Sequence, residues 1–212
     1  MPAYPFEKAA DHTRPHGSHR YDVFGPKLGR TIALFGREAL NAWTVIESDP
    51  AITYYCERPL VVPKTSPKRV VDFWVKRKAG GEFWLLLRPS ELDSNLAPEL
   101  PPAFRTWATS GQHAVKLIKP DSLVVNKHLL ENWGWIIRDL SAFGKFVDKN
   151  VLDAVRSAIT IPVELGRLEC DFFEYDPILV RVAAFSLIYR GQALCRSLGV
   201  ARIGPTTVIE PV

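Results

Sequence analysis

Two apolar segments joined by a short glycine-containing turn constrain the fold of this chain more than any other feature. Residues 69–75 and 82–87 are rich in β-branched and aromatic side chains, and the sequence KRKAGG lies between them. This pattern predicts a β-hairpin, because glycines let the backbone reverse between two strands. The fold must therefore contain at least one antiparallel strand pair.

The sequence before this hairpin predicts a helix and then further strands. Apolar residues recur at helical spacing in residues 35–46. Asp49-Pro50 ends that run, because the residue before proline avoids helical backbone angles. Residues 52–57 and 60–62 have the composition of strands. The order is a helix followed by a meander of strands.

The sequence after the hairpin predicts mainly helices. A short helix at 102–108 and a strand at 114–118 precede a long helical region at 121–145. Residues 162–173 and 177–189 show two more helical patterns, and a glycine-punctuated stretch ending in TTVI follows. Two helices followed by a wing-like hairpin is the layout of a winged helix, a small module that docks on DNA or protein.

These patterns divide the 212 residues into four parts: an extended basic arm at 1–30, an α/β domain at 31–120, a helical linker at 121–148 and a winged-helix-like domain at 149–212. The arm mixes basic residues with prolines and glycines and has no helical or strand period. Its sequence HTRPHGSH contains three histidines, which suggests a metal site or a flexible arm. The absence of helical spacing and of a cysteine partner favours the arm.

Basic residues are concentrated around the hairpin. Residues 60–90 contain seven of them, against two acidic residues, Asp72 and Glu82. A local excess of positive charge is expected of a surface that contacts nucleic-acid phosphates, and it also occurs on ordinary solvated faces. The seven are Lys64, Lys68, Arg69, Lys76, Arg77, Lys78 and Arg88.

Neither the cysteines nor the hydropathy indicates a secreted or membrane protein. Cys56, Cys170 and Cys195 are odd in number and widely spaced, so neither a disulfide framework nor a zinc ligand set is visible. The first residues lack an apolar signal core, and Arg181 interrupts the apolar stretch at 178–189. We therefore expect a reduced, cytoplasmic setting and no membrane association.

Four short motifs follow one another along residues 49–89. The motifs are Asp49-Pro50, Glu57-Arg58-Pro59, Val71-Asp72-Phe73 and Leu85-Leu86-Leu87-Arg88-Pro89. The chain resembles the TnsA-type endonucleases, the strand-nicking subunits of heteromeric bacterial transposases, over about residues 27–208, and its motifs occur in the order in which that family has them. The resemblance implies an α/β fold: a restriction-endonuclease-like mixed sheet flanked by helices, followed by a small winged-helix-like C-terminal domain.

The resemblance also implies a metal site of carboxylates and a lysine on adjacent strands. Asp72 matches the strand aspartate that binds metal. The next ligand position falls on Leu86, which has no ligand atom, and the lysine position falls on Arg88, which keeps its proton. The helix glutamate falls near Ala39, and Glu38 beside it points about 100° away. The catalytic residues that remain, Asp72 and Arg88, therefore form a degenerate site. This site either binds Mg²⁺ through Asp72 or has no cofactor.

Alternative interpretations stay open for each retained residue. Asp72 is either a structural acid paired to Arg69 or Arg88 or a remaining metal ligand, and Arg88 pairs with Asp72 or contacts a DNA phosphate. One alternative function is an active metal-dependent endonuclease with migrated ligands, and another is a nuclease fold repurposed as an interaction module. The candidates for migrated ligands are Glu38, Glu57 and Glu82.

The function that the resemblance implies is that of a cleavage-deficient TnsA-like component of a DNA transposition machine. Its expected partners are transposon-end DNA, a DDE-type transposase subunit and an AAA+ ATPase regulator in a bacterial cytoplasm. The basic hairpin and arm would hold the DNA backbone without reading its sequence. The candidate DNA contacts are Lys76, Arg77, Lys78, Arg181, Arg190 and Arg202.

Overall fold

The hairpin predicted around the KRKAGG turn is present in the computed structural model of the chain. Its strands are β4 (Phe73–Arg77) and β5 (Gly80–Leu86), which run antiparallel and extend into the expected turn. Gly81 has no room for a side chain, because a Cβ there would lie 2.5 Å from the ring of Trp74. The glycine therefore serves close packing as well as chain reversal.

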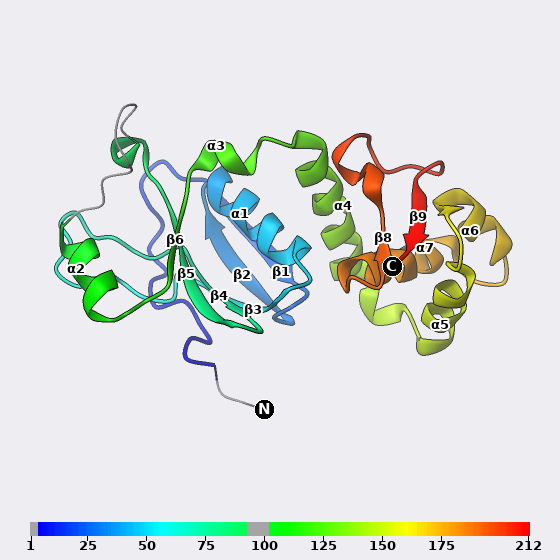
Figure 1. The fold of residues 1–212 in the computed structure, drawn as a ribbon, viewed down its shortest axis with the longest axis horizontal. Helices are drawn as coiled ribbons and strands as arrows, with labels where there is room; N and C mark the ends of the chain where they lie inside the picture. Colours follow the sequence, from blue (N-terminus) through cyan, green and yellow to red (C-terminus); the bar gives the residue numbers. More distant parts are fainter. Residues whose placement is uncertain (1–3, 93–101) are drawn as a thin grey trace. The chain divides into compact units, whose positions relative to one another are not determined.

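The structure describes residues 4–92 and 102–212, and these residues form two compact units (Figure 1). The first unit contains the described residues of Met1–Ile46 and Ala51–Val125. The second contains Glu47–Pro50 and Asn126–Val212. Each unit has its own core and is described by itself below.

A four-stranded mixed sheet is the centre of the first unit. Its strand order is β3-β4-β5-β6, with β3 (Ile52–Glu57) antiparallel to β4 and β6 (Val115–Ile118) parallel to β5. The strands expected at 52–57 and 114–118 are confirmed. The parallel β5–β6 pair requires a crossover connection, and this connection contains the 3₁₀ turn η1 (Pro89–Glu91) and helix α2 (Pro102–Ser110).

Both faces of this sheet are covered. Helix α1 (Arg37–Ser48) lies on one face, where the indole of Trp43 donates a 2.7 Å hydrogen bond to the Tyr55 hydroxyl. Helix α2 covers the other face and contributes Phe104 to a buried cluster. The short helix α3 (Pro120–Leu123) follows β6. The members of the cluster are Val62, Val71, Trp74, Phe83, Leu85 and Phe104.

Residues 59–70 depart from the predicted meander. The strand expected at 60–62 and the start of the one expected at 69–75 are reduced to an isolated bridge between Val61 and Val70. The physical reason is the repeated proline in this segment, at 59, 63 and 67, because proline has no N–H to donate to a strand ladder.

The N-terminal segment also differs from the extended arm expected at 1–30. It enters a β-hairpin formed by β1 (Arg20–Gly25) and β2 (Arg30–Phe35). Residues 4–19 contain no helix and no regular strand before Arg20. Tyr4 stacks on Tyr54 of β3, with ring centroids 3.7 Å apart, so this segment packs on the sheet instead of extending freely.

The second unit combines helices with a small three-stranded sheet. Helix α7 (Pro177–Tyr189) is apolar on nearly every side and is buried from Val180 to Ile188 except at Arg181, so it forms the central core element. The strands lie in the order β7 (Val163–Glu164), β9 (Val208–Pro211) and β8 (Ala193–Leu194), all antiparallel. The elements of the unit are α4 (Lys127–Phe143), η2 (Gly144–Phe146), α5 (Lys149–Ala158), β7 (Val163–Glu164), α6 (Leu165–Asp171), α7 (Pro177–Tyr189), β8 (Ala193–Leu194), η3 (Arg196–Gly199) and β9 (Val208–Pro211).

Capping residues explain where the helices of the second unit begin. The side chains of Asn126, Asp148 and Asp176 each accept a hydrogen bond from a backbone N–H in the first turn of α4, α5 and α7. Helix α4 was expected to be a linker, but its buried residues, among them Trp133 and Ile136, pack within this unit. No helix in the described part of the chain combines the length and the apolar character that crossing a membrane requires.

Candidate functional site

Asp72 lies immediately before β4 and is held to β5 by its side chain. Its Oδ2 atom accepts a 2.7 Å hydrogen bond from the backbone N–H of Leu86. Its own carbonyl accepts a 2.8 Å hydrogen bond from the backbone N–H of Arg58. About a quarter of the side chain is exposed, at 25%. The carboxylate therefore sits at a fixed position on the border between strand and solvent.

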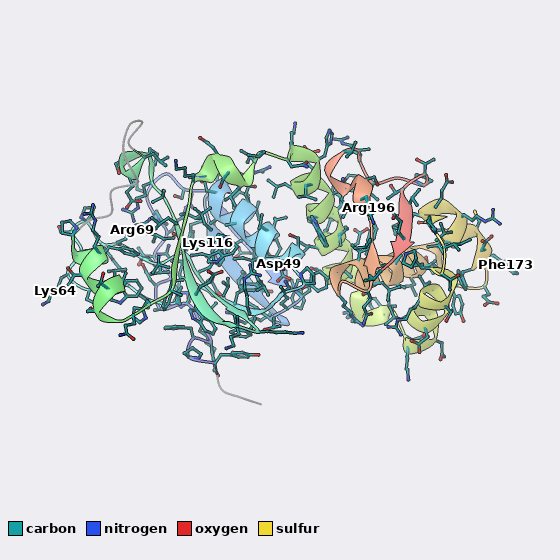
Figure 2. All side chains as sticks on the ribbon, in the orientation of Figure 1. Asp49, Lys64, Arg69, Lys116, Phe173 and Arg196 are labelled. Atoms are coloured by element: carbon teal, nitrogen blue, oxygen red, sulfur yellow. The ribbon has the colours of Figure 1, made fainter. Side chains whose placement is uncertain are left out.

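The guanidinium of Arg69 occupies the space between Asp72 and a second carboxylate, Glu91. Nη1 of Arg69 lies 3.8 Å from Oδ2 of Asp72, and Nη2 lies 3.1 Å from Oε2 of Glu91. Nη2 also donates a 2.5 Å hydrogen bond to the carbonyl of Leu86. The Arg69 side chain is only 5% exposed, and Figure 2 shows it inside the first unit. Nη1 also donates to the carbonyl of Val70 at 3.4 Å, so one buried cation contacts four oxygen atoms.

Glu91 is the member of this site that the sequence did not suggest. Its Oε2 atom accepts hydrogen bonds from the Arg69 guanidinium and, at 2.7 Å, from the backbone N–H of Arg88. The available signal was local, because a proline followed two residues later by glutamate is typical of the first turn of a helix. The turn η1, which begins at Pro89, is what brings Glu91 back toward the sheet.

Burial and nearby arginines set the charge state of the site. Burial raises the pKa of Asp72 from 3.8 to about 6, and Arg69, the Leu86 N–H, Arg58 and Arg88 each lower it by a smaller amount. Burial and the neighbouring Arg69 charge also lower the pKa of Arg88. Three guanidinium groups therefore surround one partly exposed carboxylate.

This donor set does not fit a divalent metal ion. Leu86 and Arg88 occupy the positions where the family resemblance implies a ligand and a lysine, and a guanidinium already lies against both nearby carboxylates. Residues 4–92 and 102–212 contain no group of three or more His, Cys, Asp or Glu side chains that is suited to hold a metal. We therefore derive no catalytic step through Mg²⁺.

The three glutamates considered as migrated ligands lie in other contacts. Glu57 is buried and bound by both guanidinium nitrogens of Arg30, at 2.8 and 2.6 Å. Glu82 accepts from the Trp84 indole at 2.9 Å and pairs with Arg77 at 3.5 Å. Glu38 is an exposed residue of α1. Since two of the three already have cationic or indole partners, their arrangement does not rebuild the lost ligand set.

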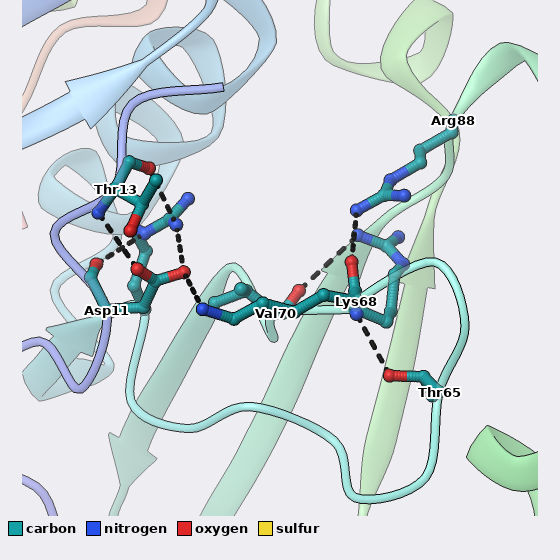
Figure 3. A network of polar contacts seen from close by, with 8 residues as sticks. Asp11, Thr13, Thr65, Lys68, Val70 and Arg88 are labelled. Atoms are coloured by element: carbon teal, nitrogen blue, oxygen red, sulfur yellow. Dashed lines mark hydrogen bonds and ion pairs between the residues drawn. The ribbon is translucent and has the colours of Figure 1, made fainter. Parts of the chain in front are cut away.

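A second polar network ties the N-terminal segment to this region (Figure 3). The buried Asp11 carboxylate contacts Nη2 of Arg58 at 2.7 Å and Nζ of Lys68 at 3.1 Å through the same oxygen, Oδ2. Its other oxygen accepts from the backbone N–H of Thr13 at 2.8 Å. The guanidinium of Arg88 reaches the carbonyl of Lys68 at 3.4 Å. The Asp11 network is therefore adjacent to the Asp72 site.

The basic hairpin proposed to hold DNA is formed as expected, but not all of its charge is available. Lys76, Arg77 and Lys78 lie together at the β4–β5 turn, where Lys78 is exposed. Arg77 pairs with Glu82. The hairpin thus presents Lys78 most freely, whereas Lys76 and Arg77 are both half-buried.

The three arginines proposed as DNA contacts in the second unit differ in their exposure and ion pairing. Arg181 is bound to Glu169 at 2.7 Å and is a less available DNA contact than expected. Arg190 is exposed just beyond α7. Arg202 is 75% exposed and pairs loosely with Glu131 at 3.7 Å. Arg190 and Arg202 are therefore the better candidates.

Comparisons of the sequence with protein-family models and with curated proteins give no match. The resemblance to TnsA-type endonucleases therefore stays a prediction that depends on the motifs in residues 49–89.

Proposed function

We propose that this chain is a TnsA-like component of a DNA transposition machine that lacks strand cleavage and acts in transposon-end DNA binding and assembly. Its partners would be a DDE-type transposase subunit and an AAA+ ATPase regulator. The observation that carries the proposal is the Arg69 guanidinium between Asp72 and Glu91. A nuclease needs a metal to neutralise charge at the scissile phosphate, whereas here the protein supplies a fixed cation.

The arrangement of elements supports the proposal at the level of the fold. A helix on one face of a mixed sheet, with an aspartate before one strand and the paired position on the next, is the layout that the resemblance implies. In the second unit, helices α6 and α7 are followed by the small strands β8 and β9, which supports a winged-helix-like docking module. Lys78, which is exposed, and the half-buried Lys76 would supply phosphate contacts.

A nicking assay tests the loss of cleavage. The purified protein, alone and with the transposase encoded beside it, is incubated with supercoiled plasmid carrying the transposon ends in Mg²⁺ or Mn²⁺. We expect the protein by itself to leave the plasmid supercoiled. Nicking that disappears in Asp72→Ala would instead establish the active endonuclease.

DNA binding is tested separately with a hairpin variant. Lys76→Ala combined with Lys78→Ala removes two phosphate contacts, so the slope of log affinity against log salt should become shallower by about 1.8, at about 0.9 per contact. Lys145→Ala combined with Lys149→Ala makes the same change of charge outside the proposed surface. Equal slopes for the two double variants would exclude the hairpin as a DNA contact.

The genes beside this one give an independent check. A neighbouring transposase and AAA+ ATPase are expected. Their absence, together with DNA binding that is indifferent to salt, would favour a nuclease fold repurposed for protein interaction.

A further inference from the structure

The N-terminal segment places a carboxylate against two cations of the sheet. Asp11 is 6% exposed, and Oδ2 alone contacts both Arg58 and Lys68. Burial by itself raises the pKa of a carboxyl, but the Thr13 N–H, Lys68 and Arg58 together hold the pKa of Asp11 well below its usual range. The carboxylate is therefore charged and held at all ordinary pH values.

The Arg58 side chain binds Asp11 through several hydrogen bonds. Its Nε donates to the carbonyl of Asp11 at 2.7 Å, and Nη2 donates to the Asp11 carboxylate and, at 3.1 Å, to the carbonyl of Thr13. Its backbone has φ +44°, a left-handed conformation that is strained for a non-glycine residue and that concentrates at functional sites. The planar fork of arginine binds carboxylate and phosphate oxygens in the same way.

The three cations and the anion differ in how they are anchored. Arg58 follows β3, Lys68 lies on the loop before β4, and Arg88 follows β5, so all three belong to the sheet region. Asp11 belongs to residues 4–19, which contain no helix and no regular strand. Near Asp11 the segment is joined to the sheet region by the Ala10 N–H, which donates to the Arg58 carbonyl at 2.9 Å, and by the Arg58 side chain, which donates to the carbonyls of Asp11 and Thr13. The Thr13 N–H bonds to the Asp11 side chain within the segment itself. The anion thus lies on the partner that has no regular secondary structure.

We propose that Arg58 and Lys68, flanked by Arg88, form a binding site for a backbone phosphodiester of DNA, which the Asp11 carboxylate fills until DNA displaces the N-terminal segment. This inference rests on the proposed DNA-binding function. Asp11 acts as an internal substitute for one phosphate. Release of the segment frees Arg58 and Lys68 from their shared carboxylate, so DNA binding and opening of the segment are coupled.

The matched variants are Asp11→Asn and Asp22→Asn. Each removes one negative charge from the same unit, but Asp22 pairs with Arg20 on β1, where both side chains are more than half exposed. Affinity for a short random-sequence duplex is measured between about 50 and about 200 mM salt, a fourfold range that changes affinity by about 3-fold per phosphate contact. Thermal unfolding followed by circular dichroism shows that each variant is folded.

We expect Asp11→Asn to bind more tightly than Asp22→Asn throughout this range, because Arg58 and Lys68 then contact the phosphate without first releasing a carboxylate. The two salt slopes should be alike, since the wild type makes the same contacts once the segment is displaced. Adding Lys68→Gln to Asp11→Asn should reduce the gain in affinity and make the slope shallower by about 0.9. Equal affinities for Asp11→Asn and Asp22→Asn, with normal wild-type binding, would overturn the inference and leave the proposed function intact. Failure of the wild type to bind duplex at any salt would overturn both.

Hydrogen exchange on the wild type keeps the test independent of the variants. The amide of Ala10 should exchange faster when duplex DNA is added, because displacement breaks its hydrogen bond to the Arg58 carbonyl. Unchanged or increased protection of this amide in the DNA complex would overturn the inference.

Discussion

Replacement of Arg69 by methionine tests whether its guanidinium serves as the cation of the Asp72 site. Methionine has a similar reach but no charge and no donor. Asp72 and Glu91 would lose their shared counter-charge, and the Leu86 carbonyl would lose a hydrogen bond. Removing one partner of a buried ion pair costs about 3–5 kcal/mol.

Two features place the expected loss at the lower end of that range. The distance from Arg69 to Asp72 is 3.8 Å, longer than a direct hydrogen bond. The Nε atom of Arg69 is buried and has no hydrogen-bond partner among the described residues, so its desolvation already costs stability that the variant would regain. We expect Arg69→Met to lower the free energy of unfolding by about 3 kcal/mol at neutral pH.

Urea unfolding followed by circular dichroism measures this loss, with Arg20→Met as the control. Arg20 forms a 2.9 Å pair with Asp22, but its side chain is 56% exposed, so its removal should cost less than about 1 kcal/mol. A loss for Arg69→Met within the range of this exposed pair would refute the idea that the guanidinium holds the two carboxylates.

Divalent ions give a sharper form of the same test. Without the guanidinium, the oxygens of Asp72, Glu91 and the Leu86 carbonyl remain around its former position, and oxygen ligands suit Mn²⁺ and Mg²⁺. We expect Mn²⁺ to stabilise Arg69→Met and to leave the wild type unchanged. At a free concentration ten times Kd the gain is about 1.4 kcal/mol. Equal effects of Mn²⁺ on both proteins would show that the arginine does not occupy a cation position.

Three further predictions concern pH, thiol reactivity and the second unit. Because burial raises the pKa of Asp72 to about 6, its ionisation removes stability as pH rises from about 4 to about 7, by up to about 3 kcal/mol. In urea unfolding, the free energy of unfolding of Asp72→Asn relative to the wild type should therefore rise by that amount between about pH 4 and about pH 7. A difference between the two proteins that stays constant with pH would contradict the raised pKa of Asp72. Cys170 is exposed, whereas burial raises the pKa of Cys56 to about 12. After treatment with a thiol alkylating reagent, mass spectrometry should therefore find Cys170 modified in the native protein and Cys56 modified only in the unfolded protein. Asn132→Leu should lower the free energy of unfolding by about 3 kcal/mol, because the buried amide serves three backbone groups that leucine would leave unpaired, and a neutral result would mean that water replaces it.

The sequence predicted elements best where one physical signal dominated. Composition located β3 (Ile52–Glu57) with its observed bounds, and helical spacing with a terminal Asp-Pro located α1 to within two residues at each end. The hairpin β1–β2 was not predicted, because the basic residues, prolines and glycines of residues 1–30 dominate the pattern there. Its strand alternation is nevertheless present: Tyr21 and Val23 are half-buried, and Arg20, Asp22 and Phe24 are exposed. The signal for α5 was also present, in the capping residue Asp148.

The site was less accessible to prediction, because its contacts join residues that are distant in the chain. Leu86 and Arg88 could be recognised as unsuited to metal chemistry from residue type alone. That Arg69 would fill the gap depends on its pairing with Glu91, 22 residues away, and the Asp11–Arg58 contact spans 47 residues. Contacts of this kind follow from tertiary packing, which local patterns do not encode.

The two networks divide the basic residues of the first unit into two groups with different consequences for DNA. Arg58 and Arg69 are largely buried and each lies within 4 Å of an internal carboxylate, so their charge reaches a phosphate only when that carboxylate moves or is protonated, and Lys68 shares the Asp11 carboxylate with Arg58. Lys78 is exposed at the β4–β5 turn and needs no such step. Initial contact should therefore depend on the hairpin and tighter binding on release of Asp11. Hairpin variants are then expected to change mainly the association rate constant, and Asp11 variants mainly the dissociation rate constant, in stopped-flow binding to duplex DNA.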